Sequence, residues 1–249
     1  MVNPKIEVCA NSAASCVAAE QGGAVRVELC AGIPEGGTTP SYGEMVTARR
    51  AIGIQLNVII RPRGGDFLYT PAEMQTMLLD IEAAKAAGAD GVVFGCLRAD
   101  GTIDVERNAE LMAAAGGLST TFHRAFDVCR DPFEALEEII ALGFDRILTS
   151  GQEASAPAGS ALIAELVRRA QGRIIIMPGC GVNESNVADL ARATGAAEFH
   201  MSARRRVEGG MAYRNERVSM GGTVTVEEFA RDITDPERVA RSIEALRHV

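Results

Sequence analysis

Two glutamates and two cysteines alternate with apolar residues in the first two short hydrophobic segments of the chain. Glu7 and Cys9 lie in the first segment, and Glu28 and Cys30 lie in the second. In a β-strand, side chains two positions apart share a face, so each glutamate faces the same way as its cysteine. The apolar residues between them should face the surrounding helices. The two Glu–Cys pairs are therefore predicted to point into the interior of the fold.

Two thiols at the ends of neighbouring strands suit a soft metal ion. Thiolate ligands favour Cu(I) over hard cations, so Cys9 and Cys30 are candidate copper ligands. The alternative is ordinary packing, because cysteine is among the residue types most often buried. Neither Cys-x-x-Cys nor His-x₃₋₅-His spacing occurs, so a closed structural zinc site is not predicted. Whether Cys129 or Cys180 takes part in metal binding is left open.

Arginines and histidines near the ends of later apolar segments suggest a different chemistry. Arg61 ends the third segment, and Arg63 follows it after a proline. A pair of guanidinium groups suits a carboxylate or a phosphate. His123 lies at the end of the fifth segment and can exchange protons near neutral pH. The candidate catalytic residues of an enzyme are Glu7, Glu28, Arg61, His123 and His200.

Glycines, hydroxyl groups and charged residues near these positions are candidates for ligand binding. Glycine lets the backbone approach a ligand closely, and the loops after the last two strands of a barrel often bind phosphate. The candidates are Arg63, Asp66, Arg124, Thr149, Ser150, Gly151, Gly179, Gly181 and Ser202. Tight turns are the alternative explanation for the glycines. A network that only stabilises the fold is the alternative for the charged residues.

Eight short apolar segments alternate with patterns of helical period along the chain. Each segment is rich in Val, Ile, Leu or Phe and is bounded by Gly, Pro or Ser, as is typical of buried parallel strands. The predicted strands span residues 6–9, 26–30, 55–61, 91–95, 119–124, 146–150, 174–178 and 198–201. This alternation predicts an α/β fold, a single-domain (β/α)₈ TIM barrel over residues 1–249. An open doubly wound sheet is the alternative, but no Gly-x-Gly-x-x-Gly turn follows the first strand.

The barrel prediction places the candidate residues together. In such barrels the C-terminal ends of the strands form the active face, so these residues should converge on one mouth. Helices are predicted over residues 70–88 and between Asp131 and Gly143. From about residue 203 we expect a long last loop and then the C-terminal helices, one of them starting at Asp235.

The composition excludes several classes of protein. The 249 residues carry 25 Lys+Arg and 33 Asp+Glu, and the formal net charge of −8 argues against nucleic-acid or anionic-membrane partners. Hydrophobic residues at 47% and charged residues at 23% are ordinary for a globular chain and exclude a disordered one. No segment has the apolar run of a membrane span or a signal peptide, so we expect a cytoplasmic protein with reduced cysteines. No organic cofactor is evident, and a homo-oligomer is left open.

Several segments together carry a family resemblance that none would carry alone. They are residues 27–30 (VELC), 35–41 (EGGTTPS), 60–66 (IRPRGGD), 121–127 (TFHRAFD), 148–152 (LTSGQ) and 213–215 (YRN). In these segments the chain resembles the CutC family, the proteins named for copper homeostasis, essentially from end to end. The resemblance implies a TIM barrel, a cytoplasmic location and a role in copper tolerance or Cu(I) binding. The family's cysteines at the ends of strands one and two are matched here by Cys9 and Cys30, and Cys129 also fits. Cys180 replaces an expected small residue, so no metal role is carried onto it.

Two functional hypotheses follow. The first is a cytosolic protein that binds and handles Cu(I) through the strand-end cysteines. The second is a TIM-barrel enzyme that acts on a small carboxylate or phosphate by acid–base chemistry of His and Glu side chains. The first requires the thiols and no anion, whereas the second requires the arginines, histidines and glutamates. The substrate and reaction of such an enzyme are not revealed by the sequence.

Overall fold

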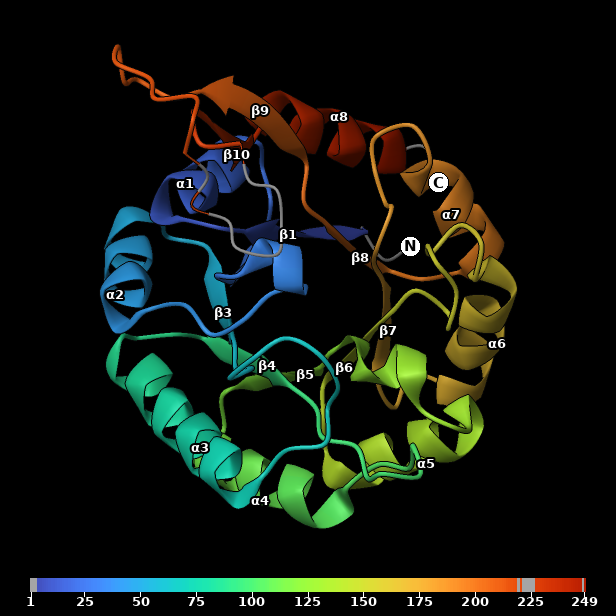
Figure 1. The fold of residues 1–249 in the computed structure, drawn as a ribbon. Helices are drawn as coiled ribbons and strands as arrows, with labels where there is room; N and C mark the ends of the chain where they lie inside the picture. Colours follow the sequence, from blue (N-terminus) through green and yellow to red (C-terminus); the bar gives the residue numbers. More distant parts are fainter. Residues whose placement is uncertain (1–3, 219, 221–226, 248) are drawn as a thin grey trace.

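Eight parallel strands surround a central axis, and helices form a ring outside them (Figure 1). The structure is a computed structural model that describes residues 4–218, 220, 227–247 and 249. One of the three histidines of the chain, His248, lies outside the described residues. The strands are β1 (Lys5–Ala10), β2 (Arg26–Leu29), β3 (Gln55–Ile59), β4 (Gly91–Phe94), β5 (Ser119–Phe122), β6 (Arg146–Thr149), β7 (Ile175–Pro178) and β8 (Glu198–Met201). Neighbours in sequence pair with one another from β1 to β7, and β8 pairs with β1. Because β7 and β8 also contact each other, the barrel is nearly closed and the predicted fold is confirmed.

One α-helix follows each strand in the ring, with short 3₁₀ helices after β2 and β5. The helices are α1 (Ala13–Gln21), η1 (Ile33–Glu35), α2 (Tyr42–Ala51), α3 (Pro71–Ala86), α4 (Val105–Ala115), η2 (Arg124–Val128), α5 (Pro132–Leu142), α6 (Ser160–Ala170), α7 (Val187–Thr194) and α8 (Pro236–Leu246). Among the described residues, none of these helices has both the length and the apolar character that crossing a membrane requires.

Local sequence signals account for where the predicted helices begin and end. The Thr70 hydroxyl accepts from the backbone N–H of Glu73, and the Glu73 carboxylate accepts in return from the N–H of Thr70, which forms a capping box for α3. The Asp131 carboxylate caps α5 in a similar way. Gly143 then ends α5 with a positive φ of 85°, a conformation that glycine adopts without strain. Both predicted helices are therefore confirmed.

The apolar face of each early strand packs against the helices. Val8, Val27 and Leu29 are fully buried and belong to one hydrophobic cluster with residues of α1 and α2, among them Cys16 and Met45. This packing fixes the direction of the alternate residues, since side chains alternate along a strand. The Glu and Cys side chains of β1 and β2 therefore face the barrel interior, as the pattern of apolar residues predicted.

Five strands end earlier than predicted: β2, β4 and β6 by one residue, and β3 and β5 by two. β3 ends at Ile59 and β5 ends at Phe122, so Arg61 and His123 lie beyond the last strand residues. Arg124 begins the short helix η2 instead of extending β5. These residues still lie at the C-terminal end of the barrel, but loop geometry and not strand alternation sets the direction of their side chains.

The chain after residue 203 is more ordered than the long loop that we expected. It forms an antiparallel pair, β9 (Arg204–Glu208) and β10 (Ala230–Thr234), before α8. Strand β9 has the sequence RRRVE and is largely exposed, so it lacks the apolar alternation by which strands are recognised. One C-terminal helix, not several, is present among the described residues.

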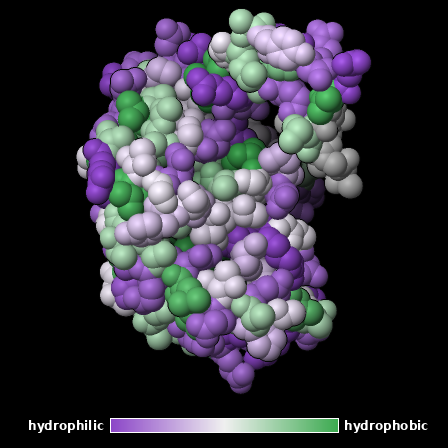
Figure 2. Space-filling model, turned by 60° about the vertical axis from the view of Figure 1, so that its left-hand side comes forward, coloured by the Kyte–Doolittle hydropathy of each residue, from purple (hydrophilic) through white to green (hydrophobic). Residues whose placement is uncertain are grey.

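The outer surface mixes polar and apolar residues. Hydrophilic side chains cover most of the face in Figure 2, and apolar side chains are scattered among them. Scattered exposure of this kind is ordinary for folded proteins and identifies no partner. A homo-oligomer therefore stays a prediction.

Candidate functional site

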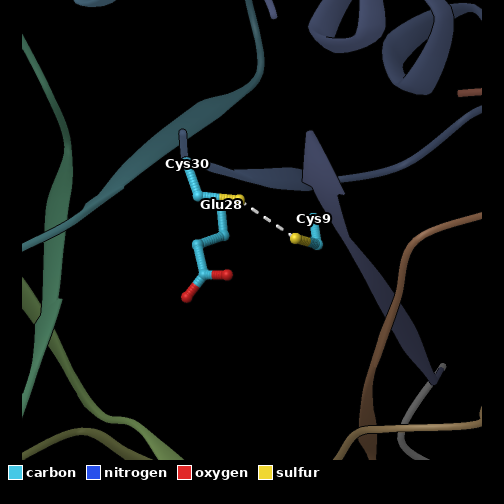
Figure 3. A group of neighbouring side chains, drawn as sticks. All are labelled: Cys9, Glu28 and Cys30. Atoms are coloured by element: carbon cyan, nitrogen blue, oxygen red, sulfur yellow. Dashed lines mark hydrogen bonds between the residues drawn. The ribbon is translucent and has the colours of Figure 1, made fainter. Parts of the chain in front are cut away.

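Cys9 and Cys30 form a close pair of thiols at the C-terminal end of the barrel. Cys9 lies in β1 and Cys30 directly follows β2, and their Sγ atoms are 3.1 Å apart (Figure 3). The Glu28 carboxylate lies beside them, so that one ligand atom from each of the three residues lies within 4.8 Å of the others. Cys30 and Glu28 are buried, whereas Cys9 is partly exposed. The pair is therefore accessible from the mouth of the barrel through Cys9.

The two thiols differ in their readiness to lose a proton. The hydrogen bond between the sulfurs holds the pKa of Cys9 well below its usual range; burial opposes this effect, and positive charge on His200 and Arg204 supports it. Arg204 Nη2 lies 3.4 Å from the Cys9 sulfur and donates to it. The same hydrogen bond, together with burial, raises the pKa of Cys30. Of the two thiols, Cys9 is therefore the one that loses its proton more readily.

His200, in β8, lies between two carboxylates. Its Nδ1 is 2.7 Å from Glu7 Oε1, and its Nε2 is 3.7 Å from Glu28 Oε2. Burial disfavours the charged imidazolium, but Glu28, Cys9 and Glu7 outweigh burial and raise the pKa of His200 well above its usual value. Burial raises the pKa of Glu28 to about 8, with His200 opposing that rise. Burial thus opposes ionisation of Glu28, whereas the neighbouring negative charges favour the charged form of His200.

A buried ion-pair network lies beneath the thiols and holds Glu7 in place. Arg26 donates from Nε to Glu7 and from Nη2, at 2.6 Å, to Glu198. Arg146 also binds Glu198, at 2.8 Å. Burial alone would raise the pKa of Glu7, but Arg26 and His200 outweigh burial and lower the pKa to about 2. Glu7 is therefore a fixed anion that orients His200, and it does not line the mouth.

Arg61, His123 and Phe67 form another part of the mouth. Arg61 donates to the backbone carbonyls of Glu35 and Gly37 and also to that of Gly65, at 2.8–2.9 Å. Its guanidinium lies over the Phe67 ring, 5.0 Å from the centroid, and the same ring meets His123 edge-on. Burial, followed by the positive charge of Arg61, lowers the pKa of His123 to about 3. His123 is therefore neutral at physiological pH, which argues against the near-neutral proton exchange that the sequence suggested.

The mouth encloses a cavity of about 590 Å³, within the range of small-molecule sites. It brings together many of the residues that the sequence singled out. The predicted residues that line it are Cys9, Glu28, Cys30, Arg61, His123, Arg124, Gly181, His200 and Ser202.

Several predicted ligand-binding residues lie outside this lining. They are Arg63, Asp66, Thr149, Ser150, Gly151 and Gly179, in addition to Glu7. Arg63 points to the start of α3, where it binds Glu73 at 2.5 Å, and it also binds Asp66 at 3.1 Å. The proline between Arg61 and Arg63 is not part of a strand, so the alternation that placed both arginines on one side does not apply.

The remaining predicted residues outside the lining have structural contacts. Thr149 and Ser150 donate to the Asp127 carboxylate and fix η2 against β6. A Cβ on Gly151 would lie 2.4 Å from a backbone oxygen, and one on Gly179 would lie 2.5 Å from the Leu148 side chain. Close packing therefore accounts for these two glycines.

The candidate site residues chosen from the sequence did not include Arg204, Arg238, Asn183 or Phe67, although all four line the cavity. Arg204 starts β9, a strand without apolar alternation, and Arg238 comes from α8. Cys180 also lines the mouth, with a positive φ of 75° and its sulfur 3.3 Å from the Ala154 carbonyl oxygen. The sequence offers one sign of this position, because Cys180 stands between two glycines in the loop after β7.

Comparison with known proteins identifies the family. A family model described as the CutC family matches residues 4–205. The chain belongs to the CutC family. A CutC family protein of Bacteroides fragilis is 61% identical over 247 residues, which cover 99% of this chain and 98% of that protein. A human protein named as a copper homeostasis protein cutC homolog is 48% identical over 241 residues, covering 97% of this chain and 88% of that one. The crystal structure of CutC from Streptococcus agalactiae has a TM-score of 0.77 at 36% identity, covering 80% of this chain and 98% of that one.

Proposed function

We propose that this CutC protein binds Cu(I) through Cys9 and Cys30 and handles copper in the cytoplasm. The observation that carries the proposal is the 3.1 Å separation of the two sulfurs at an accessible end of the barrel. Two sulfurs that share a metal ion at bond lengths of about 2.3 Å lie at most about 4.6 Å apart, so this pair needs only a small side-chain rotation. Thiolate softness then selects Cu(I) over harder ions.

The electrostatics around the pair support this assignment. Cys9 loses its proton more readily than an ordinary cysteine, because Cys30 and the charge of Arg204 lower its pKa. Binding of Cu(I) would replace the hydrogen bond between the sulfurs by two metal–sulfur bonds and release the proton of Cys30. Glu28 is a hard oxygen donor, and its carboxylate points away from the two sulfurs (Figure 3), so it contributes less to Cu(I) than the thiols do.

The enzyme hypothesis has a weaker basis at this site. His123 has a pKa of about 3 and is neutral, so acid–base chemistry would fall on Glu28 and His200. Those two side chains face the same thiols, and a copper ion at Cys9 would change the charge that both of them experience. We therefore favour copper binding as the function of this end of the mouth.

The test is a competitive titration of the reduced protein with Cu(I) against a chromophoric chelator. We expect one Cu(I) per chain, with an affinity that falls by at least about a hundredfold in the Cys9→Ser/Cys30→Ser double variant. Cys180→Ser is the matched control, because Cys180 lines the same mouth without contacting either sulfur in the described hydrogen bonds. Equal affinity of the double variant and the wild-type protein would refute the proposal.

A further inference from the structure

One ring nitrogen of His123 is buried at the mouth without a hydrogen-bond partner. The side chain is 3% exposed, and Nδ1 accepts a hydrogen bond from the backbone N–H of Ala125 at 3.3 Å. An imidazole nitrogen that accepts a hydrogen bond carries no proton, so in the neutral ring Nε2 is the protonated donor. Among the described residues nothing accepts from Nε2. A buried donor of this kind lowers the stability of the folded protein unless a ligand or water accepts a hydrogen bond from it.

Arg61 is a buried positive charge whose hydrogen bonds all go to uncharged groups. It is 5% exposed, its terminal nitrogens donate to three backbone carbonyls, and its Nε has no partner. Within the described part of the chain no carboxylate lies within 4.0 Å of its nitrogens. Burial of a charge is costly unless an opposite charge compensates for it. A bound anion would provide that compensation.

Arg204, at another part of the lining, also lacks a carboxylate partner among the described residues. Its Nη2 donates to the Cys9 sulfur, its Nε is buried without a partner, and it forms no ion pair with a carboxylate among the described residues. The two other arginines of the mouth differ, because Arg124 binds Asp127 at 2.6 Å and Arg238 binds Glu184 at 3.0 Å. Among the described residues, the lining side chains with a buried nitrogen that lacks a hydrogen-bond partner are thus His123, Arg61 and Arg204.

We propose that the mouth holds a small organic oxyanion, a carboxylate or a phosphate ester, which accepts hydrogen bonds from His123 and is paired with the charges of Arg61 and Arg204. The three residues that carry these unpartnered nitrogens, two of them arginines without a carboxylate partner among the described residues, line one cavity of about 590 Å³. That volume is sufficient for a metabolite and much larger than a single ion requires. The oxyanion site adjoins the thiol pair, because Arg204 also donates to the Cys9 sulfur, but none of its three side chains supplies a sulfur ligand.

The charge of the mouth agrees with this assignment. Among the described residues the lining has one carboxyl group, that of Glu28, and four arginines, Arg61, Arg124, Arg204 and Arg238. His123 is held neutral by burial and therefore acts as a hydrogen-bond donor that does not titrate near pH 7.

The experiment is isothermal titration calorimetry of the reduced, copper-free protein with two probes, inorganic phosphate and malonate. We expect at least one probe to bind with a Kd of about 1 mM or below, and the tighter probe indicates whether the natural ligand is a phosphate or a carboxylate. His123→Phe and Arg204→Met should each weaken binding by about tenfold or more, because each removes a hydrogen bond to a charged group. Two substitutions are used so that the inference does not depend on the folding of one variant.

Two controls separate this proposal from copper binding. Arg168→Gln removes one positive charge from the exposed face of α6, far from the cavity lining, and should leave binding unchanged. The Cys9→Ser/Cys30→Ser variant should bind the probe within about threefold of the wild-type protein, even if it loses Cu(I). The proposal is overturned if neither probe binds below about 10 mM, if both mouth variants bind as the wild-type protein does, or if the cysteine variant loses the probe.

Discussion

Replacement of Glu7 by glutamine tests whether the buried ion-pair network stabilises the barrel. Glu7 is 1% exposed and interacts with Arg26 and His200. Its pKa falls from 4.5 to about 2 in the folded protein, a difference of about 2.5 pH units. At about 1.4 kcal/mol per unit this corresponds to about 3 kcal/mol of stability, the same order as the cost of breaking a buried ion pair.

The sign of the pH dependence follows from the direction of the shift. A carboxylate with a lowered pKa stabilises the fold fully above its unfolded value of 4.5, and this contribution is lost as the pH falls towards about 2. Glu7→Gln should therefore lower the free energy of unfolding by about 3 kcal/mol at neutral pH, and the deficit should shrink below pH 4.5. Arg26 keeps Glu198 as a partner in the variant, so the barrel should still fold.

Urea unfolding followed by circular dichroism, repeated between about pH 7 and about pH 3, measures this difference. The matched control is Glu137→Gln, which breaks an exposed glutamate–arginine pair with Arg173 and should cost at most about 1 kcal/mol. The reasoning fails if Glu7→Gln costs no more than the control, or if its deficit stays constant as the solution is acidified.

Two further predictions concern Glu28, which lines the cavity, and Arg63, which lies outside the lining. Glu28→Gln should become progressively more stable than the wild-type protein as the pH rises from about 4.5 to about 8, because burial raises the pKa of Glu28 and the folded state resists its ionisation. Urea midpoints of both proteins over that pH range measure the difference in stability, and a difference that stays constant with pH would contradict the prediction. Arg63→Gln should leave phosphate and malonate binding unchanged in calorimetry. It should lower the free energy of unfolding by at most about 1 kcal/mol, since Arg63 pairs with Glu73 and Asp66 near the surface. Weaker binding of either probe to the variant would show that Arg63 takes part in the oxyanion site.

The positions of the two thiols show what the alternation of side chains along a strand can predict and what it cannot. Val8 and Val27 pack against helices, so Cys9 and Glu28 had to face inward, and the sequence was sufficient to predict this. The distance between the two sulfurs also depends on how the strands are paired. Cys9 lies opposite Glu28 in the strand register, so Cys30 is one residue beyond the last paired position of β2, and only the stagger of the two strands brings its sulfur to 3.1 Å.

The arginines of the mouth show where the sequence was insufficient. Arg61 and Arg63 are two residues apart, but Arg61 turns to the carbonyls of the η1 loop and Arg63 turns to α3. Arg204 arrives from β9, whose basic sequence resembles an exposed loop. Side-chain direction in such segments is set by contacts with distant parts of the chain, which periodicity does not encode.

The sequence by itself determined the alternation of strands and helices, the inward direction of the first two Glu–Cys pairs and the face of the barrel where polar residues gather. Those properties depend on hydrophobic periodicity and on helix-capping residues, both of which are local. The tertiary structure alone decided that His123 is neutral, that Glu7 is a fixed anion, and which arginines lack a carboxylate. Burial and the placement of charges from distant segments set these properties, because a pKa depends on everything that surrounds the group in space.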